Sequence, residues 1–244
     1  MPATDYSYLG SGKVYLRPYG AAQGLVEVGN VSELTLGVNE TTVSIKDFTQ
    51  PGGGTRNEVR RIESVDLQMT MSDLSPENLA RAVFGTTTAA AAGTGVAETA
   101  TAYADSFVPL QYPPTNVTSV TDGGPTTYTE GTDYEVRPGG LYILPGTTIP
   151  DGSSITVTYD HAAVDVVQAL VDSAKQWEIV FAGLNEARSG KEVVVTIHKA
   201  TLGAAQQIPL VGEEYATVQV AGKLLADTSK GAGLSQYFKA VLVA

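Results

Sequence analysis

Two glycine-rich stretches have residue types and spacing that could do chemistry, because the backbone N–H groups of glycine loops bind phosphate. They are Pro51-Gly-Gly-Gly54 and Gly10-Ser-Gly-Lys13. The first precedes a strand-like sequence and not a helix whose N-terminus could hold an anion. The second has Val14 where a phosphate loop needs Ser or Thr to bind Mg²⁺, and it lacks the earlier glycine. Neither pattern predicts a nucleotide site.

Residues for hydrolytic or metal chemistry are few and poorly spaced. The two histidines, His161 and His198, have neither the HxxxH nor the HExxH spacing of a zinc site. The sequence has no cysteine and no GxSxG motif, so it offers no thiolate ligand and no typical serine nucleophile. The pair Glu213-Glu214 leaves a carboxylate hydrolase open as an alternative. We expect no catalytic residue, no cofactor and no metal.

The charge balance argues against a protein that grips nucleic acid. The chain has 15 Lys and Arg against 26 Asp and Glu, a net charge of -11, whereas tight binding requires phosphates to be neutralised. The local cationic group is Arg56, Arg60 and Arg61, which we expect to pair with Glu58 and Glu63 or with a neighbouring subunit. The sequence shows no signal-peptide pattern at its start and no apolar run of about 18 residues, so no membrane partner is expected.

The elements that must position these residues are mainly strands. Residues 59–71 alternate strictly, with Val65, Leu67, Met69 and Met71 on one face and polar residues on the other. Residues 75–84 predict a helix with Ser75 as N-cap, Pro76 in the first turn and Gly85 as the stop. Other β-branched or alternating runs predict strands at 12–17, 25–36 (extended by Val43 and Ile45), 164–171 (with a helix as the alternative), 176–183, 192–201, 215–221 and 237–243.

Two central segments differ from this pattern. Residues 86–101 are rich in Ala, Thr and Gly, which predicts a mobile surface loop. Residues 105–160 alternate short strands with Pro/Gly turns and predict an inserted β-rich outer subdomain. The sequence therefore predicts a mainly β protein. Its core comprises residues 1–104 and 161–244, with the flanking helix 75–84 and a long loop over 44–58.

The order of several segments resembles the major tail tube protein of long non-contractile-tailed bacteriophages. These segments are GSGKVYL, VEVGNVSELTL, KDFTQPGGG, RRIESVDLQMTMSDLSPENLARAVFG, QWEIVFAGLNEARSGKEVVVTIHKATL and YATVQVAGKLLAD. The resemblance covers nearly the whole chain apart from residues 86–160. It implies a β-barrel or sandwich fold whose strands join a ring-wide barrel around a lumen. It also implies hexameric rings stacked into a tube, through which DNA passes without specific binding.

The resemblance also implies site residues and partners. A loop docks onto the next ring, and here it would comprise Lys46, Asp47, Phe48, Gln50, Pro51, Gly52, Gly53, Gly54 and Arg56. The candidates for the lumen are Glu33, Asp66, Gln68 and Glu178. Partners would be further copies of the chain, tail terminator and tail tip proteins, and a tape measure protein in the lumen. The protein would be made in the host bacterial cytoplasm and located in the virion. The alternative is a carbohydrate- or surface-binding β-sandwich module of a virion, with residues 105–160 as the binding part.

Overall fold

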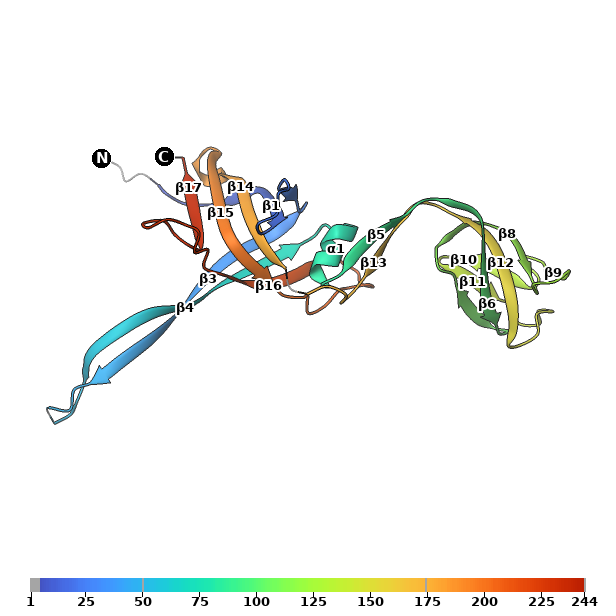
Figure 1. The fold of residues 1–244 in the computed structure, drawn as a ribbon, viewed down its shortest axis with the longest axis horizontal. Coiled ribbons are helices and arrows are strands. Elements are labelled where there is room, and N and C mark those ends of the chain that lie inside the picture. The colour runs from blue at the N-terminus through green and yellow to red at the C-terminus, as the bar shows by residue number, and fades with distance from the viewer. Residues whose placement is uncertain (1–4, 50, 174, 244) are drawn as a thin grey trace. The chain divides into compact units, whose positions relative to one another are not determined.

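The computed structural model describes residues 5–49, 51–173 and 175–243, and the fold is mainly β (Figure 1). The chain divides into two compact units. The first comprises the residues up to Thr86 and those from Val167 onward, and the second comprises Thr87–Val166. The second unit thus begins before, and ends after, the 105–160 span expected from the turn pattern.

One antiparallel sheet dominates the first unit. Its strand order is β2-β1-β14-β15-β16-β4-β3, and β17 pairs with β15 beside this path. The strands span β1 Gly10–Pro18, β2 Val26–Glu27, β3 Val31–Lys46, β4 Thr55–Met71, β14 Gln176–Asn185, β15 Lys191–Leu202, β16 Val218–Leu224 and β17 Phe238–Leu242. A short 3₁₀ helix, Glu186–Arg188, connects β14 to β15.

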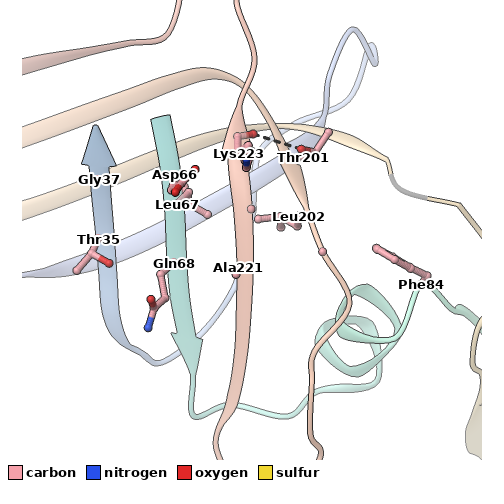
Figure 2. Close-up of a pocket in the computed structure, with 12 residues that line it drawn as sticks. Thr35, Gly37, Asp66, Leu67, Gln68, Phe84, Thr201, Leu202, Ala221 and Lys223 are labelled. Atoms are coloured by element: carbon pink, nitrogen blue, oxygen red, sulfur yellow. Dashed lines mark hydrogen bonds between the residues drawn. The ribbon is translucent and has the colours of Figure 1, made fainter. Parts of the chain in front are cut away.

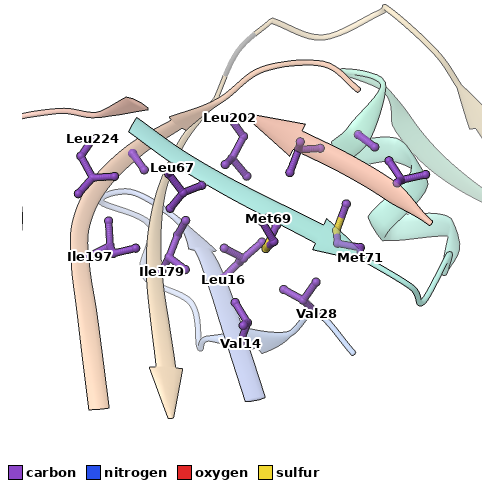
Figure 3. Packing of buried hydrophobic residues seen from close by; sticks show 14 of the residues in the cluster. Val14, Leu16, Val28, Leu67, Met69, Met71, Ile179, Ile197, Leu202 and Leu224 are labelled. Atoms are coloured by element: carbon purple, nitrogen blue, oxygen red, sulfur yellow. The ribbon is translucent and has the colours of Figure 1, made fainter. Parts of the chain in front are cut away.

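The core of this sheet confirms the alternation expected for β4. Val65, Leu67, Met69 and Met71 are buried, while the polar residues between them are only half-buried. Figure 3 shows Leu67 and Met69 packing toward Leu16, Ile179 and Ile197 of the facing strands. The sheet therefore folds over itself, with its apolar side inward and its polar side outward.

Helix α1 spans Pro76–Ala82 and begins as the sequence predicts, because the Asn78 N–H donates to the Ser75 hydroxyl at 3.3 Å. The left-handed residue after the helix is Phe84, with φ 50°, and not Gly85. Gly85 has a different reason to be glycine: a Cβ there would lie 2.4 Å from the carbonyl oxygen of Gln168. Close approach of the backbone, and not helix termination, requires this glycine.

The second unit contains two small antiparallel sheets, which are ordered β6-β12-β8-β9 and β10-β11-β7. Their apolar sides form a separate core that includes Val120, Leu141, Ile155, Val157 and Tyr159. The strands span β6 Gly93–Ala102, β7 Ser106–Pro109, β8 Pro114–Thr121, β9 Thr127–Tyr128, β10 Tyr134–Arg137, β11 Gly140–Ile143 and β12 Ser153–His161. The paired strands β5, Thr86–Ala90, and β13, Val164–Gln168, link this unit to the first.

Two sequence predictions are wrong in this region and at the start of the chain. Residues 86–101 are not a loop, because they form β5 and most of β6, and β6 pairs along β12. The run 25–36 is not one strand, since it is interrupted around Gly29, which has φ 91°. A Cβ on Gly29 would also lie 2.4 Å from the Asp73 carboxylate. Both the backbone conformation and the lack of space therefore favour glycine at this turn.

Candidate functional site: a projecting hairpin and a polar groove

The predicted loop 44–58 is the end of a long two-stranded hairpin. The arm, residues 39–63, comprises the distal parts of β3 and β4 and their connecting tip, and it extends away from the body of the sheet (Figure 1). Its described residues are exposed, apart from the half-buried Asp47. Several of them are large and apolar with at least half of their surface exposed: Val43, Ile45, Phe48, Val59 and Ile62. The arm therefore contributes nothing to the core, although it carries residues suited to burial.

A β-bulge changes which side chains share a face of the arm. Asn39 pairs with Ser64 and Glu40 with Ile62, so Glu63 is an extra residue on β4. The Thr41 hydroxyl donates to Glu63 at 2.7 Å, and the Asn39 amide donates to Asp66 at 2.6 Å. These two hydrogen bonds connect β3 to β4 on either side of the bulge, and both lie on the same face of the hairpin.

The bulge inverts the alternation of β4 within the arm. β3 alternates without interruption here, so Val43 lies on the same face as Asn39 and Thr41. Val59 is directly opposite Val43 and therefore shares that face. Two apolar side chains thus continue the face that carries Asp66 in the body of the sheet. Simple alternation along β4 would place Val59 with Val65, on the other face.

Hydrogen bonds order the tip of the arm around Asp47. The Asp47 N–H donates to the Gly54 carbonyl at 2.7 Å. The Thr49 hydroxyl and N–H both donate to Asp47 Oδ1, at 2.6 and 2.8 Å, and these bonds lower the pKa of the Asp47 carboxyl. Gly52 and Gly53 have φ 99° and 58°, a region that favours glycine. Phe48 is 85% exposed beside them.

The other predicted docking residues surround this tip. Lys46 ends β3 opposite Thr55, and Arg56 lies at a second register shift of β4. Pro51 and Gly54 belong to the turn itself. Gln50 lies outside the described residues.

The arginines of the arm have different surroundings. Arg60 forms an ion pair of 3.2 Å with Glu58, as the sequence predicts. Glu63 accepts its hydrogen bond from Thr41 instead of an arginine. Such exposed pairs contribute little to stability, typically about 0–1 kcal/mol. The cationic side chains of the arm are therefore accessible to a partner.

The polar side of the sheet contains a groove of about 710 Å³ (Figure 2). Asp66 and Gln68 of β4 line it side by side, as expected for two polar residues two positions apart on one strand. Lys223 of β16 is the direct cross-strand neighbour of Asp66, so a positive charge stands beside the carboxylate. Apart from these polar side chains, the lining of this polar groove is mostly small or apolar. It includes Gly37, Gly203, Ala221 and Gly222 together with Leu67 and Leu202, and Figure 2 shows Phe84 at one end.

The four lumen candidates do not form one cluster. Glu33 lies on β3 next to Thr70, and it also lines a separate hollow of about 260 Å³ beside β1. Glu178 lies on β14, where it forms an ion pair of 2.7 Å with Arg17. Arg17 Nε also donates to Glu178 at 2.8 Å. Asp66 and Gln68 line one groove together, Glu33 lines a different hollow, and the charge of Glu178 is balanced by Arg17.

The glycines of Gly10-Ser-Gly-Lys13 have a structural reason unrelated to phosphate. The stretch lies in β1, and Gly12 is the cross-strand partner of Gly183. A Cβ on Gly12 would lie 2.3 Å from the Gly183 Cα. Two strands can approach this closely only where both residues lack a side chain.

A surface of the second unit bears on the carbohydrate-binding alternative. Phe107 and Tyr142 are cross-strand neighbours on the three-stranded sheet. The Arg137 guanidinium stacks over the Tyr142 ring at 3.7 Å and pairs with Glu135 at 3.0 Å, while the Tyr142 hydroxyl donates to Asp105. Because Arg137 covers one face of Tyr142, that face is not open for stacking against a sugar.

Sequence reasoning missed two features of the first unit. One is the hydrogen-bond cluster around the buried Asp227, which connects residues more than 200 positions apart and leaves no local signal. The other is the irregular segment 203–217, whose Leu210, Val211 and Tyr215 are almost fully exposed. It includes the first three residues of the strand predicted at 215–221, because β16 begins only at Val218. The sequence feature that could have indicated this segment is the apolar pair Leu210-Val211, which lies between Pro209 and Gly212 and outside any periodic pattern. The Glu213-Glu214 pair lies in this segment, beside a hollow that these two residues and Tyr215 line within the described chain.

The comparisons with known proteins give a family without a described activity. Within the described residues, no helix is long and apolar enough to cross a membrane, and no three metal-ligating side chains come together. No curated protein matches the chain at a significant level. Residues 7–241 match the model of the family described as "Protein of unknown function UCP028589". Because the match covers nearly its whole length, the chain belongs to that family.

Proposed function

We propose that this protein is the virion structural protein that forms the tail tube of a long-tailed bacteriophage, as stacked hexameric rings through which DNA leaves the particle. The observation that carries the proposal is the arm. It extends from the folded body, has no core of its own and exposes Val43, Ile45, Phe48 and Val59. Exposed apolar groups gathered on a projecting element are typical of a surface that another molecule covers.

The edges of the main sheet support assembly between copies. β3 is the last strand in its sheet order, so one edge of this 16-residue strand has no neighbouring strand among the described residues. At the opposite end, β2 covers only Tyr15 and Leu16 of β1. Long open edges favour pairing with another chain. When each copy offers one edge to the next, such contacts close into a ring or continue as a filament.

The polar groove supports the proposed conduit. Its exposed polar groups are mostly short or uncharged, and the acidic Asp66 stands beside Lys223. Such a surface has little net charge to hold phosphates, in contrast to the basic clusters of proteins that bind nucleic acid tightly. We assign Asp66, Gln68 and Glu33 to the lumen. Glu178 belongs to the same side of the sheet, but its ion pair with Arg17 makes it a structural residue.

Negative-stain electron microscopy of the purified protein tests this function. Rings or tubes of uniform width are the expected result, together with a sedimentation coefficient that rises with concentration. A protein that stays monomeric and binds glycans on an array would overturn the proposal in favour of a carbohydrate-binding module. A monomer that hydrolyses glycosides would favour the hydrolase alternative.

A further inference from the structure

The segment Gly203–Thr217 connects β15 to β16 without a helix or strand of its own. Connections of this length without regular structure are uncommon and usually have a function. Its beginning is fixed, because the Gly203 N–H donates to the Ala221 carbonyl and the Ala205 N–H donates to the Ala82 carbonyl, both at 2.7 Å. Beyond Ile208 the side chains are exposed as far as Tyr215. The segment is therefore anchored to the sheet and to α1 at one end and presents its middle to solvent.

The exposed middle of this segment combines apolar and acidic side chains. Leu210, Val211 and Tyr215 are 88%, 97% and 99% exposed. Glu213 and Glu214 lie between them in the sequence, and neither has an ion-pair partner among the described residues. Three large apolar side chains in one short segment favour burial against a partner. The adjacent negative charges favour a partner that is basic where it meets them.

The tip of the arm has the complementary character. Phe48 is 85% exposed in the turn that connects Lys46, the last residue of β3, to Thr55 and Arg56 at the start of β4. Within the part of the chain that the structure describes, neither of these cations takes part in an ion pair. The chain at the tip thus carries an exposed apolar side chain and two positive charges, whereas the segment carries exposed apolar side chains and two negative charges.

The two surfaces cannot meet within one copy. Figure 1 shows the arm leading away from the body of the main sheet, whereas β16, which directly follows the segment, lies in that body. We propose that the arm tip of one copy docks on the 203–217 segment of a second copy. This proposal rests on the proposed function, and it names the surface that receives the arm. Because tip and segment are different patches, every copy can receive one arm and extend its own, so the contact repeats along an assembly.

Disulfide trapping tests this contact directly, since the natural chain has no cysteine. Phe48→Cys and Tyr215→Cys proteins are prepared separately, mixed in equal amounts and oxidised. A disulfide forms only where the two Cα atoms come within about 7 Å. The expected result is a covalent dimer from the mixture and little from either variant alone. The matched control mixes Phe48→Cys with Tyr103→Cys, since Tyr103 is an exposed tyrosine of the second unit.

Charge reversal provides a second test that needs no covalent bond. Glu213→Lys with Glu214→Lys is expected to raise the concentration needed for assembly about tenfold, and so is Lys46→Glu with Arg56→Glu. Combining the two pairs in one chain should restore most of the assembly, because opposite charges face one another again. Glu130→Lys with Asp165→Lys changes the net charge as much as the Glu213/Glu214 reversal does, but at exposed positions on the second unit, and should leave assembly unchanged.

The outcomes separate this proposal from the proposed function. The wild-type chain can form tubes while the cysteine mixture gives no more dimer than the Tyr103 control and combined charge reversal gives no rescue. This result overturns the proposed docking surface and leaves the proposed tube function standing. A wild-type chain that stays monomeric overturns both. A mixed dimer together with charge rescue supports the docking of the arm on the segment.

Discussion

The hydroxyl of Tyr19 donates a hydrogen bond of 2.9 Å to Asp227 Oδ1, and so joins the turn after β1 to the loop before β17. The same oxygen accepts from the Ser229 hydroxyl at 2.6 Å, and Lys230 lies 3.5 Å from the other carboxylate oxygen. The Asp227 N–H donates to the Gln236 carbonyl at 2.9 Å. This buried carboxylate therefore closes the loop that delivers β17 to the edge of β15.

Replacing Asp227 with Asn is expected to lower the Tm at pH 7. The hydrogen bonds from Ser229 and Tyr19 hold the pKa of the Asp227 carboxyl well below its usual value of about 3.9. A carboxyl whose pKa is lowered by folding stabilises the fold above its unfolded pKa and loses this effect as pH falls toward the folded pKa. The difference in Tm between wild type and Asp227→Asn should therefore be largest near neutral pH and shrink below about pH 4.

Thermal melts followed by circular dichroism at pH 7, 4 and 3 check this pH dependence. Asp165→Asn, at an exposed position, is the matched control and should show no such trend. A Tm difference that stays constant across these pH values would contradict the assigned role of the ionised carboxylate.

Shortening the arm is expected to stop assembly without unfolding the subunit. Residues 47–54 are replaced by Asn-Gly, which favours a two-residue turn between antiparallel strands. The Tm should not change, because the arm makes no contribution to the core. Electron microscopy and sedimentation should show only unassembled protein. Tubes of normal length from this variant would remove the arm from the assembly interface.

Two positions on β4 contrast the body of the sheet with the arm. Met69→Ala removes a fully buried side chain and should lower the free energy of unfolding by about 2–5 kcal/mol. Ile62→Ala, at a position 57% exposed, should change it by less than about 0.5 kcal/mol. Urea denaturation of unassembled protein measures both. Equal losses at the two sites would mean that the arm is part of the cooperative core.

The paired glycines of β1 and β14 predict a steric defect. Gly12→Ala places a methyl group against the backbone of Gly183 and should destabilise the fold by about 1–3 kcal/mol. Gly24→Ala is the control, because a Cβ at Gly24 meets no atom within 4 Å. Urea titrations of the two variants compare their free energies of unfolding. A fully tolerated Gly12→Ala would contradict the close approach of the two strands.

The tube proposal predicts an effect of positive charge on DNA passage. Asp66→Lys with Glu33→Lys should permit assembly but slow DNA release from particles, because lysines in the lumen attract phosphates. Raising the salt concentration should restore the rate, since it screens these charges. Release is followed by the fluorescence of a DNA-binding dye. Glu130→Lys with Asp165→Lys is the control, and an unchanged rate in the lumen variant would refute the lumen assignment.

Local signals in the sequence predict much of the main sheet. The alternation of residues 65–71 and the Ser75-Pro76 start of α1 both have short-range physical causes, and the structure confirms both. Residues 86–101 have too few large side chains to predict a strand. Their partner strands complete the pairing: β5 pairs with β13, and β6 pairs with β12, which contributes Ile155 and Val157 to the core.

Long-range features of the candidate site could not be read in this way. The pairing of Glu178 with Arg17 joins residues 161 positions apart. The face occupied by Val59 depends on one extra residue at Glu63, which shifts the register without any mark in the composition. The composition of the arm indicated a contact loop, but only the register of its strands shows which side chains that contact would include.

The absence of a core beneath the arm also has a consequence for hydrogen exchange. Among the described residues, the amide protons of the arm are protected by hydrogen bonds between its own two strands, and an isolated two-stranded hairpin is marginally stable in water. In a free subunit these amides should exchange through local opening. The amides of β14 and β15 should exchange much more slowly, because their exchange requires larger and rarer openings. A partner that binds the arm with its two strands paired suppresses this local opening and so slows the exchange of these amides. Slower exchange confined to residues 39–63 would therefore report occupancy of the arm without the need to observe the assembly itself.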